Sequence, residues 1–438
     1  MTLKRWLKYR TTLASQAREK GEGEVARLIG WVASKREHGK KIFITLRDSS
    51  GFIQVVGAAP SRKPKAFETM RDVNLESAIA VEGIIVRDPR APHGVEVRVR
   101  DFRVIAGAQP WPITLSALKS PGFLFDMRHL TLRGKRTRAI TLIRGEMLRA
   151  AQEYFEGNGY VWFQGPTFIT SACEGGATLF KVDYFGGTVY LTQSAQLYEE
   201  AAICALERVY VIQPSFRSEK SRTRKHLTEY WHIESEAAFA AHEDIMEVEE
   251  ELVQHMVSRV VERRQEELAT LKVEDLEPPK TPFAKITYDE ALGILRGKGI
   301  DLDWGEDLGS KAERLLCKQF EEPFFVTAYP TKARSFYHMP DPERPEVTLS
   351  SDLMAPGGYG EITSGGQRIH DYDLLLSRIH EQGLDPEEYR WYLDLRRFGM
   401  PPHSGFGLGL ERLMGWTLNL EHVRQAILFP RTPSRTYP

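Results

Sequence analysis

The sequence predicts an α+β protein in which a small β-barrel precedes a larger domain of mixed helices and strands, and three observations support this. The chain has 438 residues, more than one hydrophobic core usually holds, so two or more domains are expected. Residues 25–107 alternate apolar and polar positions with the period of β-strands. Beyond residue 136, helical and extended patterns alternate over a much longer stretch.

The first domain is predicted from five short strand-like stretches rich in β-branched residues and separated by Gly, Pro and Asp-Ser-Ser. They read "VARLIGWVASKR", "KIFITLRD", "GFIQVVG", "SAIAVEGIIVRD" and "GVEVRVRDFRVIAG". A helical stretch, "KAFETMRDV", separates the third from the fourth. This order is typical of a closed barrel of the OB type over residues 25–107. Residues 1–24 form an N-terminal extension to which the sequence assigns no role, and the proline-bearing segment 108–135 is predicted to be a hinge.

The larger domain, residues 136–438, begins with the helical stretch "RAITLIRGEMLRAAQEYFEGNGY". An extended run, "VWFQGPTFI", follows and is interrupted at Pro166. Further strands are expected at "GTVYLTQS", "RVYVIQPSFRSE" and "TEYWHIESEAAF", before a long helix "HEDIMEVEEELVQHMVSRVVERRQEEL".

Composition limits the cellular setting and the partners. The formal net charge is −1, so any contact with nucleic acid must come from local basic patches. No apolar run approaches the length of a membrane span, and the N-terminus lacks the apolar core of a signal peptide. The three cysteines are too far apart in sequence to indicate a zinc site or a disulfide framework. We therefore expect a cytoplasmic protein without a membrane partner.

The stretch "FRSEKSRTRKHLTEYWHIESEAAF", residues 216–239, predicts a polar site. Its loop is dense in cations, which suits a polyphosphate or the end of an RNA. The strand after the loop places these residues on one face: Thr228, Tyr230, His232, Glu234 and Glu236. Acidic side chains on an inward face are costly in a core, so we interpret this face as the lining of a site and not as an exposed hairpin.

A second candidate stretch is "HSGFGLGLERLMGWTL", residues 403–418. Gly405, Gly407 and Gly409 alternate with apolar residues, which predicts a buried strand whose glycines leave room for a flat or bulky group. Leu413, Trp416, Leu418 and Leu420 predict a helix directly after it. Arg412 would then lie near a strand-to-helix junction, where anions are favoured.

These stretches together resemble class II aminoacyl-tRNA synthetases. "GYVWFQGPTFI", "FRSE" with its basic loop and "HLTEY", and "GFGLGLERL" are similar to motifs 1, 2 and 3 of that class, and they occur in the family's order. The N-terminal OB barrel narrows the resemblance to the group specific for Asp, Asn and Lys. The resemblance covers residues 25–438 and implies a catalytic domain built on an antiparallel sheet flanked by helices.

The resemblance implies ATP as a substrate and Mg²⁺ as its metal ion. Arg217 and Arg412 are the expected catalytic residues, Arg217 on the α-phosphate and Arg412 on the other phosphates of ATP. Glu219 would accept from the adenine amino group and Tyr230 would stack on the adenine, in place of the more usual phenylalanine. His226 and Arg224 would approach the γ-phosphate. The expected metal ligands are Asp352, Glu361 and Ser364.

The same resemblance places the amino-acid pocket at six residues: Glu174, Ser194, Gln196, Glu199, Glu234 and Arg368. Aspartyl enzymes typically carry a lysine after "QLY", where this chain has Glu199, and tend to have Asp where this chain has Glu234. A glutamate about 4 Å from a substrate carboxylate would cost on the order of 4 kcal/mol at an effective dielectric of about 20, roughly a thousandfold in specificity. The sequence therefore favours asparagine over aspartate.

The implied activity is ATP-dependent ligation of asparagine to tRNA(Asn) through asparaginyl-adenylate. Lys35, Arg36, Phe43 and Gln54 would bind the anticodon, although Phe43 also fits a place in the barrel core. A homodimer is expected, with Pro166 near the contact. Three alternatives stay open at this point: an aspartyl enzyme, possibly non-discriminating; an inactive RNA-binding paralogue; and an ATP-dependent amide-forming synthetase.

Overall fold

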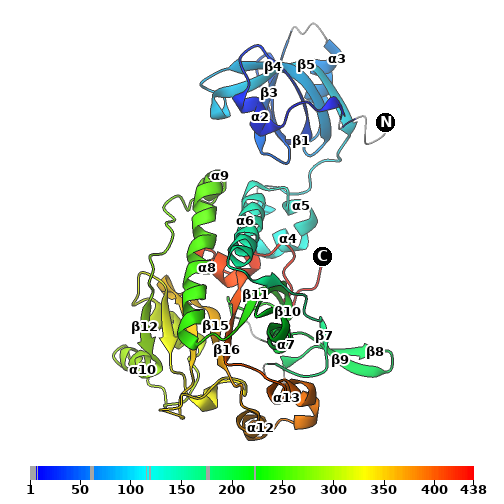
Figure 1. Cartoon of the computed structure of the whole chain (residues 1–438). Helices are drawn as coiled ribbons and strands as arrows, with labels where there is room; N and C mark the ends of the chain where they lie inside the picture. Colours follow the sequence, from blue (N-terminus) through cyan, green and yellow to red (C-terminus); the bar gives the residue numbers. More distant parts are fainter. Residues whose placement is uncertain are drawn as a thin grey trace. The chain divides into compact units, whose positions relative to one another are not determined.

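The computed structural model describes residues 6, 8–59, 64–114, 116–117, 120–173, 178–220 and 223–438. The chain divides into two compact units, Met1–Phe123 and Leu124–Pro438. Figure 1 draws both units, and each is described here by itself.

The first unit is a closed barrel with the strand order β1-β2-β3-β5-β4. Its strands are β1 (Val25–His38), β2 (Lys41–Arg47), β3 (Phe52–Ala58), β4 (Ala78–Arg87) and β5 (Val95–Ala106), with helix α3 (Pro64–Asp72) between β3 and β4. In β2, Ile42, Ile44 and Leu46 point into the apolar interior, so alternate residues face out. The predicted OB-type barrel is confirmed.

Part of the segment before β1 packs on this barrel. Helix α2 (Ala14–Glu19) buries Ala14 and Ala17 in the barrel's apolar cluster. The backbone N–H of Ala14 donates to Asp48 Oδ2 at 2.7 Å. These residues therefore contribute to the stability of the barrel, a role that the sequence did not reveal because α2 is short and its partners lie far along the chain.

The second unit is built on an eight-stranded sheet with the order β12-β13-β14-β15-β16-β11-β10-β6. Its strands are β6 (Val161–Trp162), β10 (Arg208–Phe216), β11 (Glu229–Ala238), β12 (Ala284–Thr287), β13 (Phe324–Thr327), β14 (Ser350–Ala355), β15 (Gly360–Arg368) and β16 (His403–Gly409). The pairs from β13 to β10 are antiparallel, whereas the outermost pair at each edge is parallel. The expected antiparallel catalytic sheet is confirmed.

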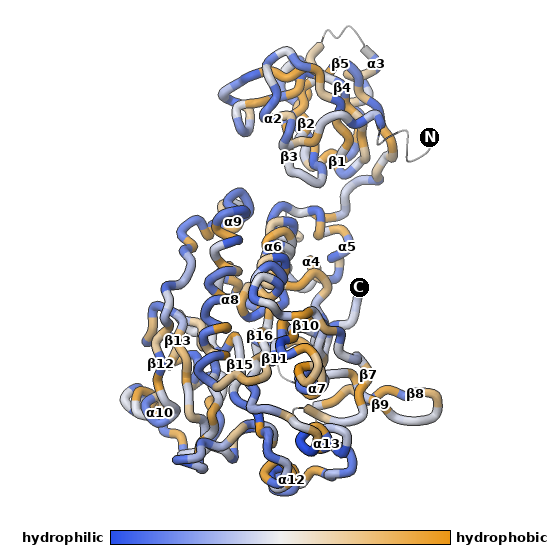
Figure 2. Tube along the Cα trace, viewed as in Figure 1, coloured by the Kyte–Doolittle hydropathy of each residue, from blue (hydrophilic) through white to orange (hydrophobic). Residues whose placement is uncertain are grey.

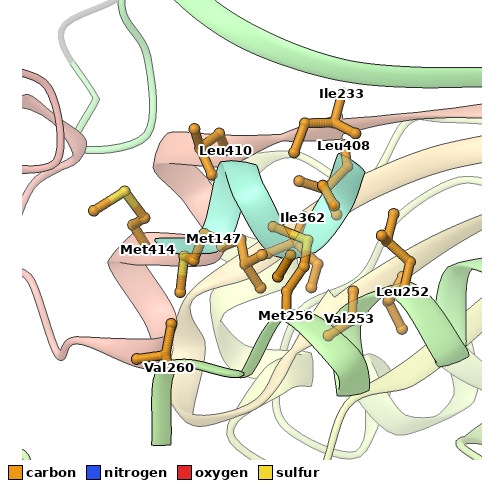
Figure 3. Packing of buried hydrophobic residues seen from close by; sticks show 14 of the residues in the cluster. Met147, Ile233, Leu252, Val253, Met256, Val260, Ile362, Leu408, Leu410 and Met414 are labelled. Carbon is orange, nitrogen blue, oxygen red and sulfur yellow. The ribbon is translucent and has the colours of Figure 1, made fainter. Parts of the chain in front are cut away.

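Helices flank this sheet (Figure 1). They are α4 (Pro121–Asp126), α5 (Arg128–Thr131), α6 (Lys135–Gly157), α7 (Gln196–Leu206), α8 (His242–Arg263), α9 (Gln265–Leu271), α10 (Tyr288–Arg296), α11 (Ser310–Cys317), α12 (Tyr372–Glu381), α13 (Arg390–Arg397) and α14 (Leu410–Thr417). One apolar cluster joins α6, α8 and α14 to the sheet, and Figure 3 shows Met256 of α8 beside Ile362 of β15. Burying such side chains contributes roughly 1.5–3 kcal/mol each.

Two sequence predictions differ from the structure in detail. The run "VWFQGPTFI" forms only the two-residue strands β6 and β7 (Phe168–Ile169), and β7 belongs to a separate three-stranded sheet with β8 (Lys181–Tyr184) and β9 (Gly187–Leu191). Helix α14 ends at Thr417, so Leu418 and Leu420 lie beyond it although both are buried in the core. In each case packing against distant elements, and not local periodicity, sets the boundary.

None of the helices in the described ranges is both long and apolar enough to cross a membrane.

Candidate active site

The candidate site lies on the face of the sheet opposite the α6/α8 core. On β11, His232, Glu234 and Glu236 point to this face, while Ile233 between them joins the core. Their partners across the ladder on β16 are the three glycines of the predicted strand. The period of two in both strands therefore separates a polar face from an apolar one, as the sequence pattern predicted.

The glycines of β16 differ in what they make room for. A Cβ at Gly405 would lie 2.1 Å from the carboxylate carbon of Glu236, so this glycine accommodates a side chain of the protein itself. Gly407 and Gly409 instead line a cavity. The expectation that all three glycines leave room for a flat or bulky bound group therefore needs correction at Gly405.

This cavity, which we call the nucleotide cavity, collects residues from β11, β15, β16, α14 and the loop between β10 and β11. The residues predicted to bind ATP or its metal ion that line this cavity are Arg217, Glu219, His226, Tyr230, Glu361 and Arg412. The other residues that line it are Lys225, Leu227, Thr228, His232, Gly407, Gly409, Glu411, Val423 and Pro433. Arg224 does not line it and belongs to an adjoining cavity.

Ion pairs and ring contacts hold the cations of the nucleotide cavity in place. Arg412, in the first turn of α14, donates from Nη1 to Glu361 Oε1 at 2.6 Å. Although burial opposes ionisation, Arg412 and Lys225 hold the pKa of Glu361 below its ordinary value. The Arg217 guanidinium lies 5.7 Å from the centre of the Tyr230 ring. The cavity therefore presents two arginines beside an aromatic face.

The surroundings of His226 in this cavity favour the neutral form of its imidazole. Its Nδ1 lies 2.6 Å from Thr223 Oγ1. Burial, reinforced by Arg412, lowers the pKa of its imidazole below the ordinary value. A neutral ring gives His226 one donor and one acceptor, so it suits an orienting hydrogen bond.

The three predicted metal ligands lie on neighbouring strands. Asp352 of β14 stands opposite Ser364 of β15 in the ladder, and Glu361 lies close enough for its charge to contribute to a raised pKa of Asp352. Arg334 forms a 2.8 Å ion pair with Asp352, a partner that the sequence did not indicate. Burial nevertheless raises the pKa of Asp352 above its ordinary value, and its Oδ1 has no hydrogen-bond partner among the described residues.

A second polar region, which we call the carboxylate pocket, surrounds Arg368 of β15. The guanidinium of Arg368 is bound by Glu236, with Nη2 to Oε1 at 2.7 Å and Nε to Oε1 at 3.0 Å. Burial raises the pKa of Glu236 to about 8, with Arg368 acting in the opposite direction. Burial and the charge of Glu234 also raise the pKa of Glu199 well above its ordinary value. The pocket therefore resists additional negative charge.

The start of α7 is fixed in the carboxylate pocket by Glu234. The hydroxyl of Ser194 donates to Glu234 Oε1, and the backbone N–H of Ala195 donates to Oε2 at 3.0 Å. This contact brings Gln196 and Glu199 to the same side of the pocket, because both lie in the first turn of α7. Glu174, the sixth predicted residue of the pocket, lies outside the described residues.

On the barrel, the structure brings together three of the four predicted anticodon residues. The Arg36 guanidinium lies 4.8 Å from the Phe43 ring centre, and its Nη2 donates to Gln54 Oε1 at 3.3 Å. Phe43 is half-buried and is not part of the apolar cluster. Lys35 points elsewhere, since its Nζ donates to the carbonyls of Arg71 and Val73 at the end of α3.

Sequence reasoning assigned no specific role to three residues that shape the site: Glu236, Glu200 and Arg334. Glu236 had a signal, because it shares the period-two face with Tyr230 and Glu234. Glu200 follows Glu199 on α7, and nothing local shows that it points into the protein. The ion pair of Arg334 joins the segment before β14 to β14 itself, and no sequence pattern indicates it.

Comparison with known proteins shows two matching families and close relatives. Residues 120–433 match "tRNA synthetases class II (D, K and N)" and residues 26–105 match "OB-fold nucleic acid binding domain". An asparagine–tRNA ligase of Thermococcus gammatolerans is 51% identical over 420 residues, covering 95% of this chain and 97% of the relative.

Solved structures show the same likeness. Asparaginyl-tRNA synthetase from Pyrococcus horikoshii, complexed with asparaginyl-adenylate, superposes with a TM-score of 0.93 and 47% identity over 98% of this chain and 99% of that one. The Entamoeba histolytica asparaginyl-tRNA synthetase has a TM-score of 0.87 and 31% identity over 96% of this chain and 98% of that one.

Proposed function

The chain belongs to the class II tRNA synthetases of the D, K and N group, and from this premise we propose that it ligates asparagine to tRNA(Asn) through an asparaginyl-adenylate intermediate. The observation that carries the proposal is the pairing of two neighbouring sites. An arginine-lined cavity beside Tyr230 suits a nucleotide, and the adjoining carboxylate pocket around Arg368 suits a small neutral amino acid.

ATP would bind in the nucleotide cavity. Tyr230 offers its ring face to the adenine and Glu219 accepts from the adenine amino group. Arg217 would hold the α-phosphate and Arg412 the distal phosphates, with His226 and the adjoining Arg224 near the γ-phosphate. Cations and one aromatic face in a partly buried cavity provide both charge neutralisation and orientation.

The first chemical step needs no protein nucleophile. A carboxylate oxygen of asparagine attacks the α-phosphorus, a new P–O bond forms, and the bond to the bridging oxygen of the β-phosphate breaks. Pyrophosphate leaves with that electron pair. In the second step a ribose hydroxyl at the 3′ end of the tRNA attacks the acyl carbon, and AMP leaves. Arg217 contributes by stabilising charge on the α-phosphate oxygens.

The proposed site for Mg²⁺ consists of Asp352, Glu361 and Ser364. The unpartnered buried Oδ1 of Asp352 is a hard oxygen of the kind that Mg²⁺ prefers. No group of three or more His, Cys, Asp or Glu side chains within the described ranges could hold a metal ion, so phosphate and water oxygens would complete the shell. Bound Mg²⁺ supplies neutralisation of phosphate charge.

Asparagine would bind with its carboxamide toward Arg368 and its ammonium group toward Gln196. The discrimination against aspartate follows from charge. Arg368 is already paired with Glu236, and the raised pKa values of Glu199 and Glu236 show the penalty that a further carboxylate would meet. A carboxamide carries no charge and avoids this penalty. Glu199 also stands where aspartyl enzymes typically have a lysine.

The anticodon is proposed to bind on the barrel at Arg36, Phe43 and Gln54. An outward-facing aromatic ring under a guanidinium is a stacking platform for an unpaired base. Lys35 is left out of this proposed surface because its Nζ donates to the carbonyls of Arg71 and Val73.

We further propose that the protein is a cytoplasmic homodimer. Edge strand β6 exposes Val161 and Trp162, the latter 53% exposed, a few residues before Pro166. Phe168 on β7 and Phe185 at the β8–β9 turn are also exposed, and Figure 2 shows hydrophobic residues along this hairpin. An apolar sheet edge of this kind is typical of an interface. The free cysteines Cys204 and Cys317 fit a reducing compartment.

ATP–pyrophosphate exchange tests the activity, because it reports amino-acid activation separately from tRNA charging. We expect exchange with asparagine and not with aspartate. Exchange with aspartate alone would refute the charge argument, and exchange with neither amino acid would favour an inactive paralogue. Light scattering of the full chain tests the homodimer, for which a monomeric mass is the opposing result.

A further inference from the structure

A second cavity adjoins the nucleotide cavity and is rich in cations. Its volume is about 580 Å³, against roughly 30 Å³ for one water molecule. The loop before β11, helix α11, the turn η5 (Pro356–Gly358) and the segment after α14 enclose it. Its charged or titratable lining residues in the described part of the chain are Arg224, Lys225, Lys311, Arg314, Tyr359, Arg412, Glu421 and His422.

The two cavities share part of their walls. Lys225, Arg412 and Val423 line both, so cations stand where one opens toward the other. Lys225 is paired with Glu313, and Arg412 with Glu361. By contrast, no carboxylate of the described residues forms an ion pair with Arg224, Lys311 or Arg314. These three side chains are exposed and available to an anionic ligand.

The local backbone positions these cations. Lys311 and Arg314 are three residues apart on α11 and therefore lie on one face of the helix. Gly358 has a φ of +94°, and a Cβ there would lie 3.2 Å from Cγ of Arg314. Glycine at this turn thus lets the backbone approach the arginine. On the opposite wall, Val423 donates its N–H to the carbonyl of Arg224 at 3.1 Å.

His422 adds a neutral donor to the cavity. Its Nδ1 accepts from the backbone N–H of Arg424 at 3.1 Å, which leaves Nε2 to carry the ring proton. Burial lowers the pKa of His422 to about 4, so the ring stays uncharged at physiological pH. An N–H donor among cations is well suited to phosphate oxygens.

We propose that this second cavity is a binding site for inorganic pyrophosphate as it leaves the active centre. The inference rests on the proposed function, in which pyrophosphate departs from the end of ATP that Arg412 holds. Pyrophosphate carries several negative charges. Because Lys225 and Arg412 line both cavities, it could contact these two cations while it moves toward Lys311 and Arg314. Lys311 and Arg314, which do not line the nucleotide cavity, would bind pyrophosphate without contributing to the affinity for ATP.

The test uses the full chain and measures binding of magnesium pyrophosphate by calorimetry, with no amino acid and no turnover. The double variant Lys311→Ala/Arg314→Ala should bind pyrophosphate about tenfold or more weakly, with ATP affinity unchanged. Lys280→Ala/Lys298→Ala is the matched control, because it removes two exposed cations that do not line the cavity. Lys311→Glu, a single surface change, should weaken pyrophosphate binding further than Lys311→Ala does.

Three results would overturn the proposal. The first is an unchanged affinity for pyrophosphate in both Lys311→Ala/Arg314→Ala and Lys311→Glu. The second is an equal loss of affinity for ATP and for pyrophosphate. The third is a loss of affinity for tRNA alone, which would identify the cavity as an RNA-binding surface. Failure of asparagine-dependent exchange in the wild type would refute the proposed function instead, and it leaves the direct binding measurement intact.

Discussion

Gln196 donates a hydrogen bond from Nε2 to Oε1 of Glu200 at 3.0 Å, one turn further along α7. The other carboxylate oxygen of Glu200 accepts from Tyr392 at 2.6 Å, Arg396 at 2.5 Å and His403 at 3.0 Å. Burial opposes ionisation, yet Arg396 and His403 hold the pKa of Glu200 well below its ordinary value. A fixed carboxylate therefore engages the amide nitrogen and orients Oε1 of Gln196, to which the Cys173 thiol donates at 3.9 Å, so that it could also accept from the ammonium group of the proposed substrate.

Glu200→Gln should consequently raise the KM for asparagine by about tenfold or more while leaving the KM for ATP unchanged. The neutral amide can present its own N–H₂ to Gln196 and no longer fixes which end of Gln196 faces the substrate. Steady-state exchange at varied asparagine and then varied ATP measures both constants. Glu207→Gln, an exposed change at the end of α7, is the control. Equal increases in both KM values would indicate general damage to the fold.

Arg412→Ala should lower ATP–pyrophosphate exchange by about a hundredfold or more, because the variant loses a cation aimed at developing phosphate charge. Binding of tRNA should survive, since the barrel is untouched. Filter binding measures the tRNA affinity beside the exchange rate, and the exposed Arg397→Ala serves as control. Exchange at the wild-type rate would remove Arg412 from the mechanism.

Glu199→Lys should shift specificity toward aspartate. Burial and the neighbouring carboxylates Glu234 and Glu236 raise the pKa of Glu199, and a cation at this position would offset the charge of those carboxylates. We expect the ratio of asparagine to aspartate exchange to fall by about tenfold or more, the ratio that a change of about 1.4 kcal/mol produces. Glu207→Lys controls for the added charge. An unchanged ratio would mean that Glu199 takes no part in discrimination.

Phe43→Ala should weaken tRNA binding by about 1–3 kcal/mol, the contribution of stacking one base on an aromatic ring. Exchange without tRNA should be unaffected, because Phe43 belongs to the barrel. Trp31→Ala is a matched control, as this ring is 44% exposed on the same barrel and lies under Arg47 instead. An equal loss of tRNA affinity in the two variants would mean that Phe43 does not form a specific binding site for the anticodon.

Local patterns predicted the parts of the fold and site that repeat along one segment. The barrel strands and the polar face of β11 follow from a period of two, and Arg412 follows from the change of pattern between β16 and α14. The unpredicted features join segments far apart in sequence. Glu236 fills the space above Gly405, Lys35 contacts the end of α3, and Arg334 pairs with Asp352. Their partners come from tertiary packing, which leaves no local signal.

Glu249 of α8 supplies a prediction on pH and stability. It is fully buried on the core side of the sheet, where the hydroxyl of Thr363 donates to it. Burial raises its pKa to about 8; of the charged groups around it, Asp352 and Glu250 act in the same direction and Arg368 in the opposite one. The native state thus holds a proton that the unfolded chain releases near its ordinary pKa of 4.5. Stability from this group is complete below pH 4.5 and is lost as the pH rises through 8.

Glu249→Gln keeps the shape of the side chain and removes its titratable group. The free energy of unfolding of the variant minus that of the wild type should therefore increase between pH 5 and pH 9, by on the order of a few kcal/mol. Urea unfolding of both proteins at the two pH values measures the difference. Glu247→Gln, exposed on the same helix, should show no such trend. A difference that stays constant with pH would mean that Glu249 is ionised in the native core, with Arg368 outweighing the effect of burial.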